Sequence, residues 1–138
     1  MTKTIIAFDY GLRNIGVAVG QTISRTASPL SVLTARDGIP NWDQLKALLE
    51  EWQPELIVVG LPLNMDGTES ELSQRSRKFA NRLHGRFGKP VELIDERLSS
   101  QEAKSVARSQ GHQGNYHDKP IDSLAAAVIL QSWFDSEN

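Results

Sequence analysis

The sequence of 138 residues contains no cysteine, which excludes disulfide bonds and any zinc site built from thiolates. It contains no apolar run close to the roughly 18 residues that a membrane-spanning helix needs. The N-terminus has no basic stretch followed by an apolar one, as a secretory leader would have. These absences predict a cytoplasmic enzyme or binding protein. Since a chain of this length can bury a core of its own, residues 1–138 are expected to form a single domain.

The chain also lacks a strong excess of either charge, because 15 Lys and Arg stand against 17 Asp and Glu. This balance argues against a protein that binds nucleic acid through its overall charge. The charges are unevenly placed, however. Residues 72–91 contain no acidic residue and six cations, which are Arg75, Arg77, Lys78, Arg82, Arg86 and Lys89. Such a segment can form a phosphate-binding surface on a nearly neutral protein, or it can be the solvated face of a helix.

Short apolar runs bounded by turn residues predict five strands, at residues 4–8, 15–19, 30–35, 56–59 and 90–94. The first three follow one another through short links, which indicates an antiparallel meander. The last two alternate with helical patterns, which is typical of parallel strands. The expected class is therefore α/β, with a five-stranded mixed sheet (three antiparallel strands, then two parallel) flanked by helices.

Helical spacing of apolar residues predicts four helices, at residues 42–52, 72–87, 99–110 and 120–134. Asn41 is the expected N-cap of the first helix, and Pro54 is expected to end it. Gly88 is expected to end the second. The predicted order of elements is βββαβαβαα.

Three carboxylates stand where a predicted strand ends or a helix begins: Asp9, Glu96 and Asp122. Acids at such positions can converge in an α/β fold and bind a hard divalent cation. Each has another interpretation. Asp followed by an aromatic residue and Gly is common in turns, and an Asp near a helix start is favoured by the helix dipole. Asp95 and Glu96 would face opposite sides of a strand, so only one of them is expected to join Asp9.

Five motifs in this order resemble those of the YqgF/RuvX family, in the ribonuclease H-like superfamily. They are Phe8-Asp9-Tyr10-Gly11, Gly16-Val17-Ala18, the loop from Val59 to Gly67, Asp95-Glu96-Arg97-Leu98-Ser99 and Asp122-Ser123-Leu124-Ala125-Ala126. The resemblance implies a ribonuclease H-like fold. It also implies a nuclease, described either as a Holliday junction resolvase or as an enzyme that processes the 5′ end of precursor 16S ribosomal RNA.

The resemblance further implies that Asp9, Glu96 and Asp122 are catalytic and bind one or two Mg²⁺ or Mn²⁺ ions. In resolvases of the RuvC type the second acid ends the fourth strand, where this sequence has Gly60. The family match therefore gives that role to Glu96, with Asp95 as the alternative. Asp118 is a weaker candidate for an additional ligand.

Three groups of polar residues are predicted to contact nucleic acid, the alternative being plain surface solvation. Arg13, Arg97 and Lys119 lie close in sequence to the proposed acids. Asn64 belongs to the loop after the fourth predicted strand, and Arg75, Lys78 and Arg82 belong to the basic segment. A resolvase that cuts two strands symmetrically is expected to be a homodimer. Two other functions are compatible with parts of the sequence. One is a non-catalytic nucleic-acid-binding factor in ribosomal RNA maturation or transcription. The other is an actin-like ATPase, which would need a second domain of the same kind.

Overall fold

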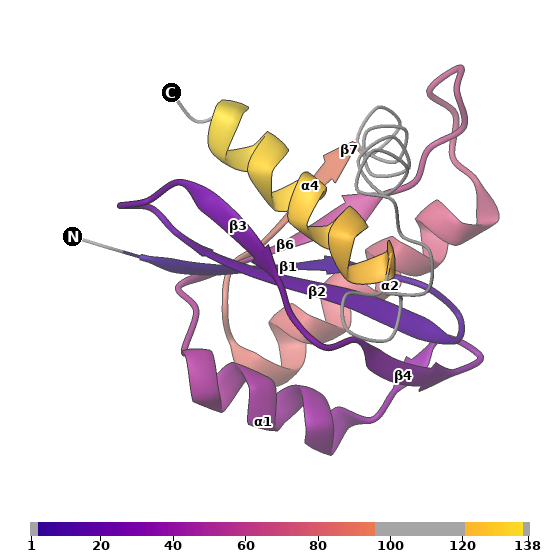
Figure 1. Ribbon diagram of the computed structural model, residues 1–138. Helices are drawn as coiled ribbons and strands as arrows, with labels where there is room; N and C mark the ends of the chain where they lie inside the picture. Colours follow the sequence, from indigo (N-terminus) through magenta and orange to yellow (C-terminus); the bar gives the residue numbers. More distant parts are fainter. Residues whose placement is uncertain (1–2, 96–120, 137–138) are drawn as a thin grey trace.

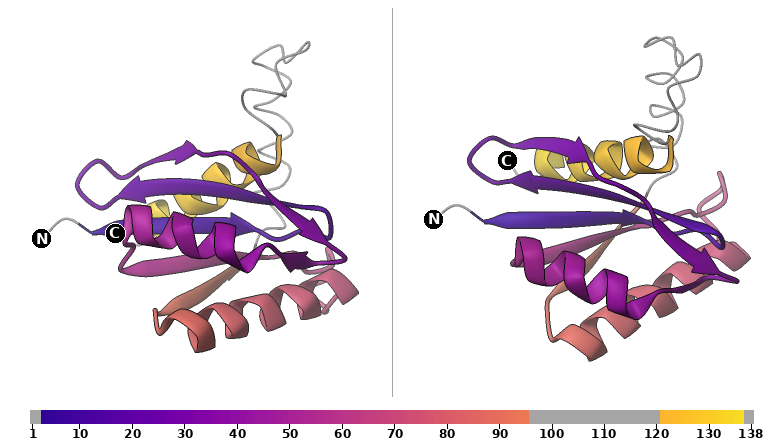
Figure 2. Two further views of the ribbon diagram at one scale, coloured as in Figure 1. Left: turned by 90° about the horizontal axis from the view of Figure 1, so that it is seen from below. Right: turned by 60° about the horizontal axis from the view of Figure 1, so that its bottom comes forward.

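The computed structural model describes residues 3–95 and 121–136, which form three layers around a mixed β-sheet. Helix α4 (Ile121–Ser136) covers one face of the sheet, and helices α1 (Trp42–Trp52) and α2 (Glu71–Phe87) cover the other (Figure 1). Figure 2 shows the same layers with α4 and α2 on opposite sides of the strands. In these described residues, no helix is both long enough and apolar enough to cross a membrane.

The centre of the sheet is a hairpin flanked by two parallel strands. Strands β1 (Thr4–Asp9) and β2 (Asn14–Gln21) pair antiparallel, while β6 (Leu56–Leu61) runs parallel to β1 and β7 (Val91–Asp95) runs parallel to β6. The strands lie in the order β5-β4-β2-β1-β6-β7. The predicted α/β class and mixed sheet are therefore confirmed.

The predicted third strand, at residues 30–35, is wrong in its bounds. Two short strands stand in its place, β3 (Thr26–Pro29) and β4 (Leu33–Arg36), and both pair with β2. Strand β3 ends at Pro29, where the backbone N–H of the next residue, Leu30, still donates to the Val17 carbonyl at 2.8 Å. The chain then crosses to the other end of β2. A two-residue strand, β5 (Ile39–Pro40), then pairs with β4, so the described residues form seven strands where five were predicted.

The ends of the described helices agree closely with the expected ones, whereas the helix predicted at residues 99–110 lies outside the described residues. The side chain of Asn41 accepts hydrogen bonds from the backbone N–H groups of Asp43 and Gln44, each at 3.1 Å. Helix α1 ends at Gln53, which is left-handed with φ 45° and directly precedes Pro54. Gly88 ends α2 in the same way, with φ 67°. These caps supply partners for backbone groups that a helix leaves unsatisfied at its ends.

The central strands bury both faces, and α4 packs directly on one of them. Phe134 packs directly on the backbone at Gly20, where an added Cβ would lie 2.7 Å from the Phe134 ring. Ala18 and Ala126, both fully buried, belong to the same apolar cluster. Small residues on β2 and on α4 together let the helix approach the sheet.

Candidate active site at the carboxyl edge of the sheet

The carboxyl ends of β1, β6 and β7 meet at one edge of the sheet, because the three strands are parallel to one another. Phe8 pairs with Val59, and Leu61 pairs with Asp95. Asp9 is the last residue of β1 and is half-buried. It therefore lies at the edge where open α/β sheets bind their ligands.

The pleat of β1 determines which face Asp9 belongs to. Ile5 and Ala7 pack in the cluster beneath α4, whereas Ile6, Phe8 and Tyr10 pack in the cluster beneath α1 and α2. Successive side chains alternate between faces, so Asp9 projects on the α4 side.

The alternation of side chains along β7 places Asp95 and Asp9 on opposite faces of the sheet. Ile94 packs against the cluster beneath α4, so the next residue, Asp95, projects on the α2 side of β7. This geometry disfavours Asp95 as the partner of Asp9. Glu96, the predicted ligand, lies outside the described residues, as do Arg97 and Lys119.

A hydrogen bond described in the structure fixes the first turn of α4 beside the end of β1. The backbone N–H of Val17 donates to the Ser123 hydroxyl at 3.2 Å, and the Ser123 side chain is fully buried. Val17 is the partner of Phe8 across the hairpin, and the neighbouring Gly16 is the partner of Asp9. Asp122 is the second residue of α4 and directly precedes Ser123. The structure thus brings the chain at Asp122 to the same end of the sheet as Asp9.

The chemistry of this edge suits a hard cation, since carboxylate oxygens are the ligands that Mg²⁺ and Mn²⁺ prefer. Among the residues described, no three acidic or histidine side chains lie close enough together to hold a metal ion. Glu96 and the side chain of Asp122 fall outside that description. The three-carboxylate site consequently stays a prediction, with Asp9 as its described member.

The loop that follows β6 is braced by its own side chains. Asn64 donates from its amide nitrogen to Thr68 Oγ1 at 3.0 Å, and Asp66 accepts from the Thr68 N–H at 3.0 Å. Glu69 accepts from the hydroxyl of Ser73 and from Arg77, and these hydrogen bonds lower its pKa. The Asn64 amide therefore holds the loop in shape, and its contact with nucleic acid remains a prediction.

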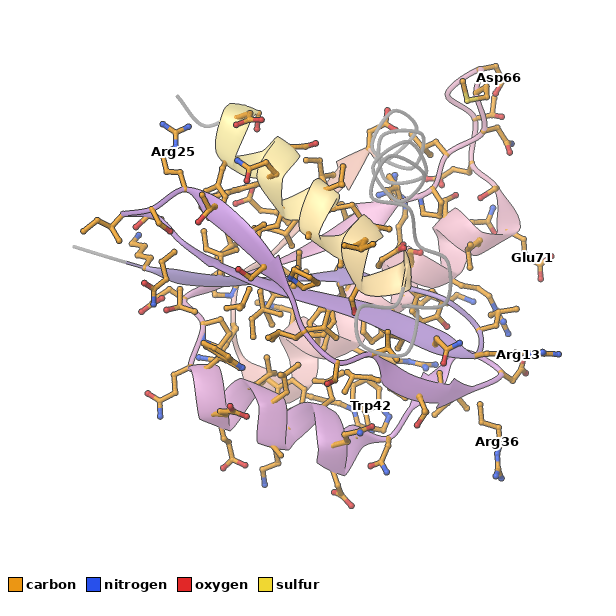
Figure 3. All side chains as sticks on the ribbon, viewed as in Figure 1. Arg13, Arg25, Arg36, Trp42, Asp66 and Glu71 are labelled. Atoms are coloured by element: carbon orange, nitrogen blue, oxygen red, sulfur yellow. The ribbon has the colours of Figure 1, made fainter. Side chains whose placement is uncertain are left out.

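The predicted cations that the structure describes lie in one turn and on one helix. Arg13 is exposed in the turn between β1 and β2, at the same end of the sheet as Arg36 (Figure 3). Arg75, Lys78 and Arg82 lie on α2 and line a pocket of about 190 Å³. Arg75 also forms an ion pair with Asp37 at 3.5 Å. The structure thus gathers three of the predicted cations into one pocket.

Two residues with clear structural roles at this edge were not among the predicted site residues. Ser123 fixes α4, and Tyr10 donates from its hydroxyl to the Gly38 carbonyl at 2.7 Å on the buried face opposite Asp9. Both stand next to a predicted acid in the sequence. That adjacency was the only signal available for them, because their partners are 106 and 28 residues away.

A family model described as "RuvX: Holliday junction resolvase" matches residues 3–136. The chain belongs to the RuvX family. Two relatives of this RuvX chain are named "Putative pre-16S rRNA nuclease". The one from Chromohalobacter salexigens is 62% identical over 96% of this chain and 89% of its own length. The one from Saccharophagus degradans is 57% identical over 96% of this chain and 94% of its own.

Solved structures support the ribonuclease H-like fold of the RuvX chain. It is similar to Thermus thermophilus RuvC in complex with a Holliday junction substrate, with a TM-score of 0.61 and 16% identity over 96% of this chain and 94% of that one. The fowlpox virus Holliday junction resolvase gives a TM-score of 0.54 and 13% identity over 96% and 98% of the two chains. At these identities the likeness concerns the fold.

Proposed function

We propose that this RuvX-family protein is a nuclease that hydrolyses phosphodiester bonds in structured nucleic acid. Asp9, Glu96 and Asp122 would hold one or two Mg²⁺ or Mn²⁺ ions at the carboxyl edge of the sheet. The observation that carries the proposal is the Val17–Ser123 hydrogen bond, which fixes the first turn of α4 beside the strand end that bears Asp9. A divalent ion bound there would supply an activated water and charge stabilisation for the leaving oxygen.

The protein contributes rigid positions for these ligands. Asp9 ends a strand that is paired on both sides, so its carboxylate is held by the sheet rather than by a loop. Asp122 would be positioned through Ser123, whose hydroxyl is anchored on β2. Arg13, exposed in the adjacent turn, would hold a phosphate of the substrate strand.

We propose precursor 16S ribosomal RNA, cleaved towards its 5′ end, as the substrate. The support is the name shared by relatives that are 62% and 57% identical to this chain. The similar structure with a Holliday junction makes branched DNA the alternative substrate, and a homodimer would then be expected.

The decisive experiment is a cleavage assay with Mn²⁺ on a 5′-extended 16S precursor fragment and on a four-way DNA junction. Asp9→Asn should abolish cleavage, because it removes a ligand charge while keeping the size of the side chain. Asp43→Asn is the matched control, since Asp43 lies in the first turn of α1 on the other face of the sheet. Equal cleavage by the wild type and Asp9→Asn would refute the catalytic assignment.

A non-catalytic role in ribosomal RNA maturation is the second candidate function, because carboxylates alone do not guarantee turnover. Complementation of a loss-of-function strain distinguishes it from the first. If Asp9→Asn restores normal 16S ends in cells, binding rather than cleavage is the biological activity.

A further inference from the structure

The pocket on α2 lies on the face of the sheet opposite to the one on which Asp9 projects. It opens between α2 and the turn that joins β4 to β5. Arg75, Lys78, Phe79 and Arg82 line it from α2, and Tyr10, Asp37, Gly38 and Ile39 complete it. Its volume of about 190 Å³ can admit a phosphate group, and its polar lining makes it a poor site for an apolar ligand.

The charge of the described pocket lining is positive, because three cations from that part of the chain stand against one carboxylate. That carboxylate, Asp37, meets Arg75 at 3.5 Å with 79% of its own side chain exposed. Exposed pairs of this kind contribute little, so Asp37 offsets the cations only in part. Lys78 and Arg82 are exposed and form no ion pair within residues 3–95 and 121–136. Cations gathered in this way favour the binding of an anion.

The floor of the pocket is rigid and uncharged. The Tyr10 ring packs on Phe79 with a centroid distance of 5.0 Å, and its hydroxyl is held by the Gly38 carbonyl. Gly38 has φ +81°, and a Cβ there would lie 2.1 Å from the Tyr10 hydroxyl oxygen.

Tyr10 also connects this pocket to the candidate active site, because it follows Asp9 directly in the chain. One strand end thus presents a carboxylate on the α4 side and the floor of a cationic pocket on the α2 side. The exposed turn that bears Arg13 comes next in the chain and lies at the same end of the sheet (Figure 3).

We propose that this pocket binds a backbone phosphate of the substrate strand, which passes from the active-site edge around the end of β1 and past Arg13. The proposal rests on the proposed function for the identity of the strand. It adds that the protein holds the strand on both faces of the sheet, through Lys78, Arg82 and Arg75 on the far side from Asp9.

The test measures binding without cleavage, by titrating a fluorescent single-stranded RNA oligonucleotide with the full chain in EDTA over a range of salt concentrations. Each lost phosphate contact should reduce the slope of log K against log salt by about 0.7 for a single strand. Lys78→Gln/Arg82→Gln should therefore lower the slope by about 1.4 and weaken binding for all base sequences. Lys46→Gln/Lys89→Gln is the matched control, because it removes the same charge from residues that line a different pocket. The slope of the control should equal that of the wild type.

An unchanged slope and affinity in Lys78→Gln/Arg82→Gln, with a normal thermal unfolding curve, would overturn the proposal. So would a wild type that does not bind the oligonucleotide. If the variant lost affinity for ATP but kept its affinity for the oligonucleotide, the pocket would be a nucleotide site and the proposal would again be wrong. The binding assay contains EDTA and no divalent metal, so its result does not depend on catalysis. A failure of the catalytic assignment would appear in the separate cleavage assay, as normal cleavage by Asp9→Asn.

Discussion

The Tyr10 hydroxyl donates a hydrogen bond to the Gly38 carbonyl, while the Tyr10 ring packs in an apolar cluster. The contribution of this hydrogen bond to stability can be measured by removing the hydroxyl alone. Tyr10→Phe removes the hydrogen bond to Gly38 and leaves that buried carbonyl without its partner. We expect the free energy of unfolding to fall by about 1–3 kcal/mol, as measured by urea denaturation at pH 7. An unchanged denaturation midpoint with an unchanged slope would show that water replaces the hydroxyl.

The same substitution should change the response to alkaline pH. Burial raises the pKa of Tyr10 in the folded protein, so the unfolded chain loses this proton first as the pH rises. The stability linked to Tyr10 is therefore complete below the unfolded pKa of 10.0 and is lost as the pH rises through the folded value. Above pH 10 the wild type should lose stability more steeply than Tyr10→Phe.

Single residues also show what sequence reasoning could find at the site. Asp9 could be predicted because an acid after a buried strand and before a glycine turn is a local pattern. Ser123 could not, since its partner Val17 is 106 residues away and a buried serine in a helix has no sequence signal of its own. The pocket around Tyr10 could not be predicted from the sequence either. It forms only because the β4–β5 turn folds back against α2, which places Gly38 against the Tyr10 hydroxyl.

The contact between α4 and the sheet depends on glycine at one position of β2. In Gly20→Ala the new methyl group would meet the Phe134 ring and the Thr26 carbonyl oxygen, both at 2.7 Å. The ring can shift, but the carbonyl belongs to the paired strand β3 and cannot move without breaking that pairing. We expect a loss of about 1–3 kcal/mol in the free energy of unfolding, measured by chemical denaturation.

Gly85→Ala is the matched control for this substitution. Gly85 is an exposed residue of α2, and a Cβ there meets nothing within 4 Å. Alanine should stabilise α2 by about 0.5–1 kcal/mol, because glycine has a higher conformational entropy in the unfolded chain. The two Gly→Ala changes are thus expected to have opposite signs. A destabilised Gly85→Ala together with a neutral Gly20→Ala would contradict the packing described for α4.

At the level of elements, prediction succeeded where the signal was local. The ends of α1 and α2 are set by Asn41, Pro54 and Gly88, which act on backbone groups within a few residues. The division of the third strand into β3 and β4 depends instead on the length of β2. Eight residues of β2 offer pairing sites to two partners, at Ala18–Gln21 and at Asn14–Ile15, and the strand pattern of residues 30–35 contains no trace of this division.

For the whole molecule, the proposed metal site makes stability depend on divalent ions. A cation that binds only the folded protein stabilises it by about 2.7 kcal/mol when the free ion is at 100 times its dissociation constant. Mn²⁺ or Mg²⁺ should therefore raise the melting temperature of the wild type. Asp9→Asn should raise the melting temperature without metal, because it relieves repulsion between carboxylates, and it should remove the response to metal. A thermal-shift assay with and without Mn²⁺ measures both effects.

Asp122→Asn provides the sharper comparison, because the position of Asp122 in the first turn of α4 has a second explanation. If Asp122 is a ligand, the variant should behave like Asp9→Asn. If its charge only interacts with the helix dipole, the variant should be less stable by about 0.3–1 kcal/mol and should keep the full response to metal. We expect Asp122→Asn to be more stable than the wild type without metal and to lose the response to metal. Lower stability with a full response to metal would show that Asp122 is not a ligand.

Helix α4 covers one face of the sheet, and this has a consequence for folding during translation. Ile5, Ala7, Ala18 and Val58 all belong to the first half of the sequence, yet they are covered by residues from the last described helix. While the ribosome is still translating the middle of the chain, the hairpin and β6 can already pair, and one side of this nascent sheet has no cover. Such a growing chain exposes an apolar surface that favours aggregation, until α4 emerges and Ser123 reaches Val17.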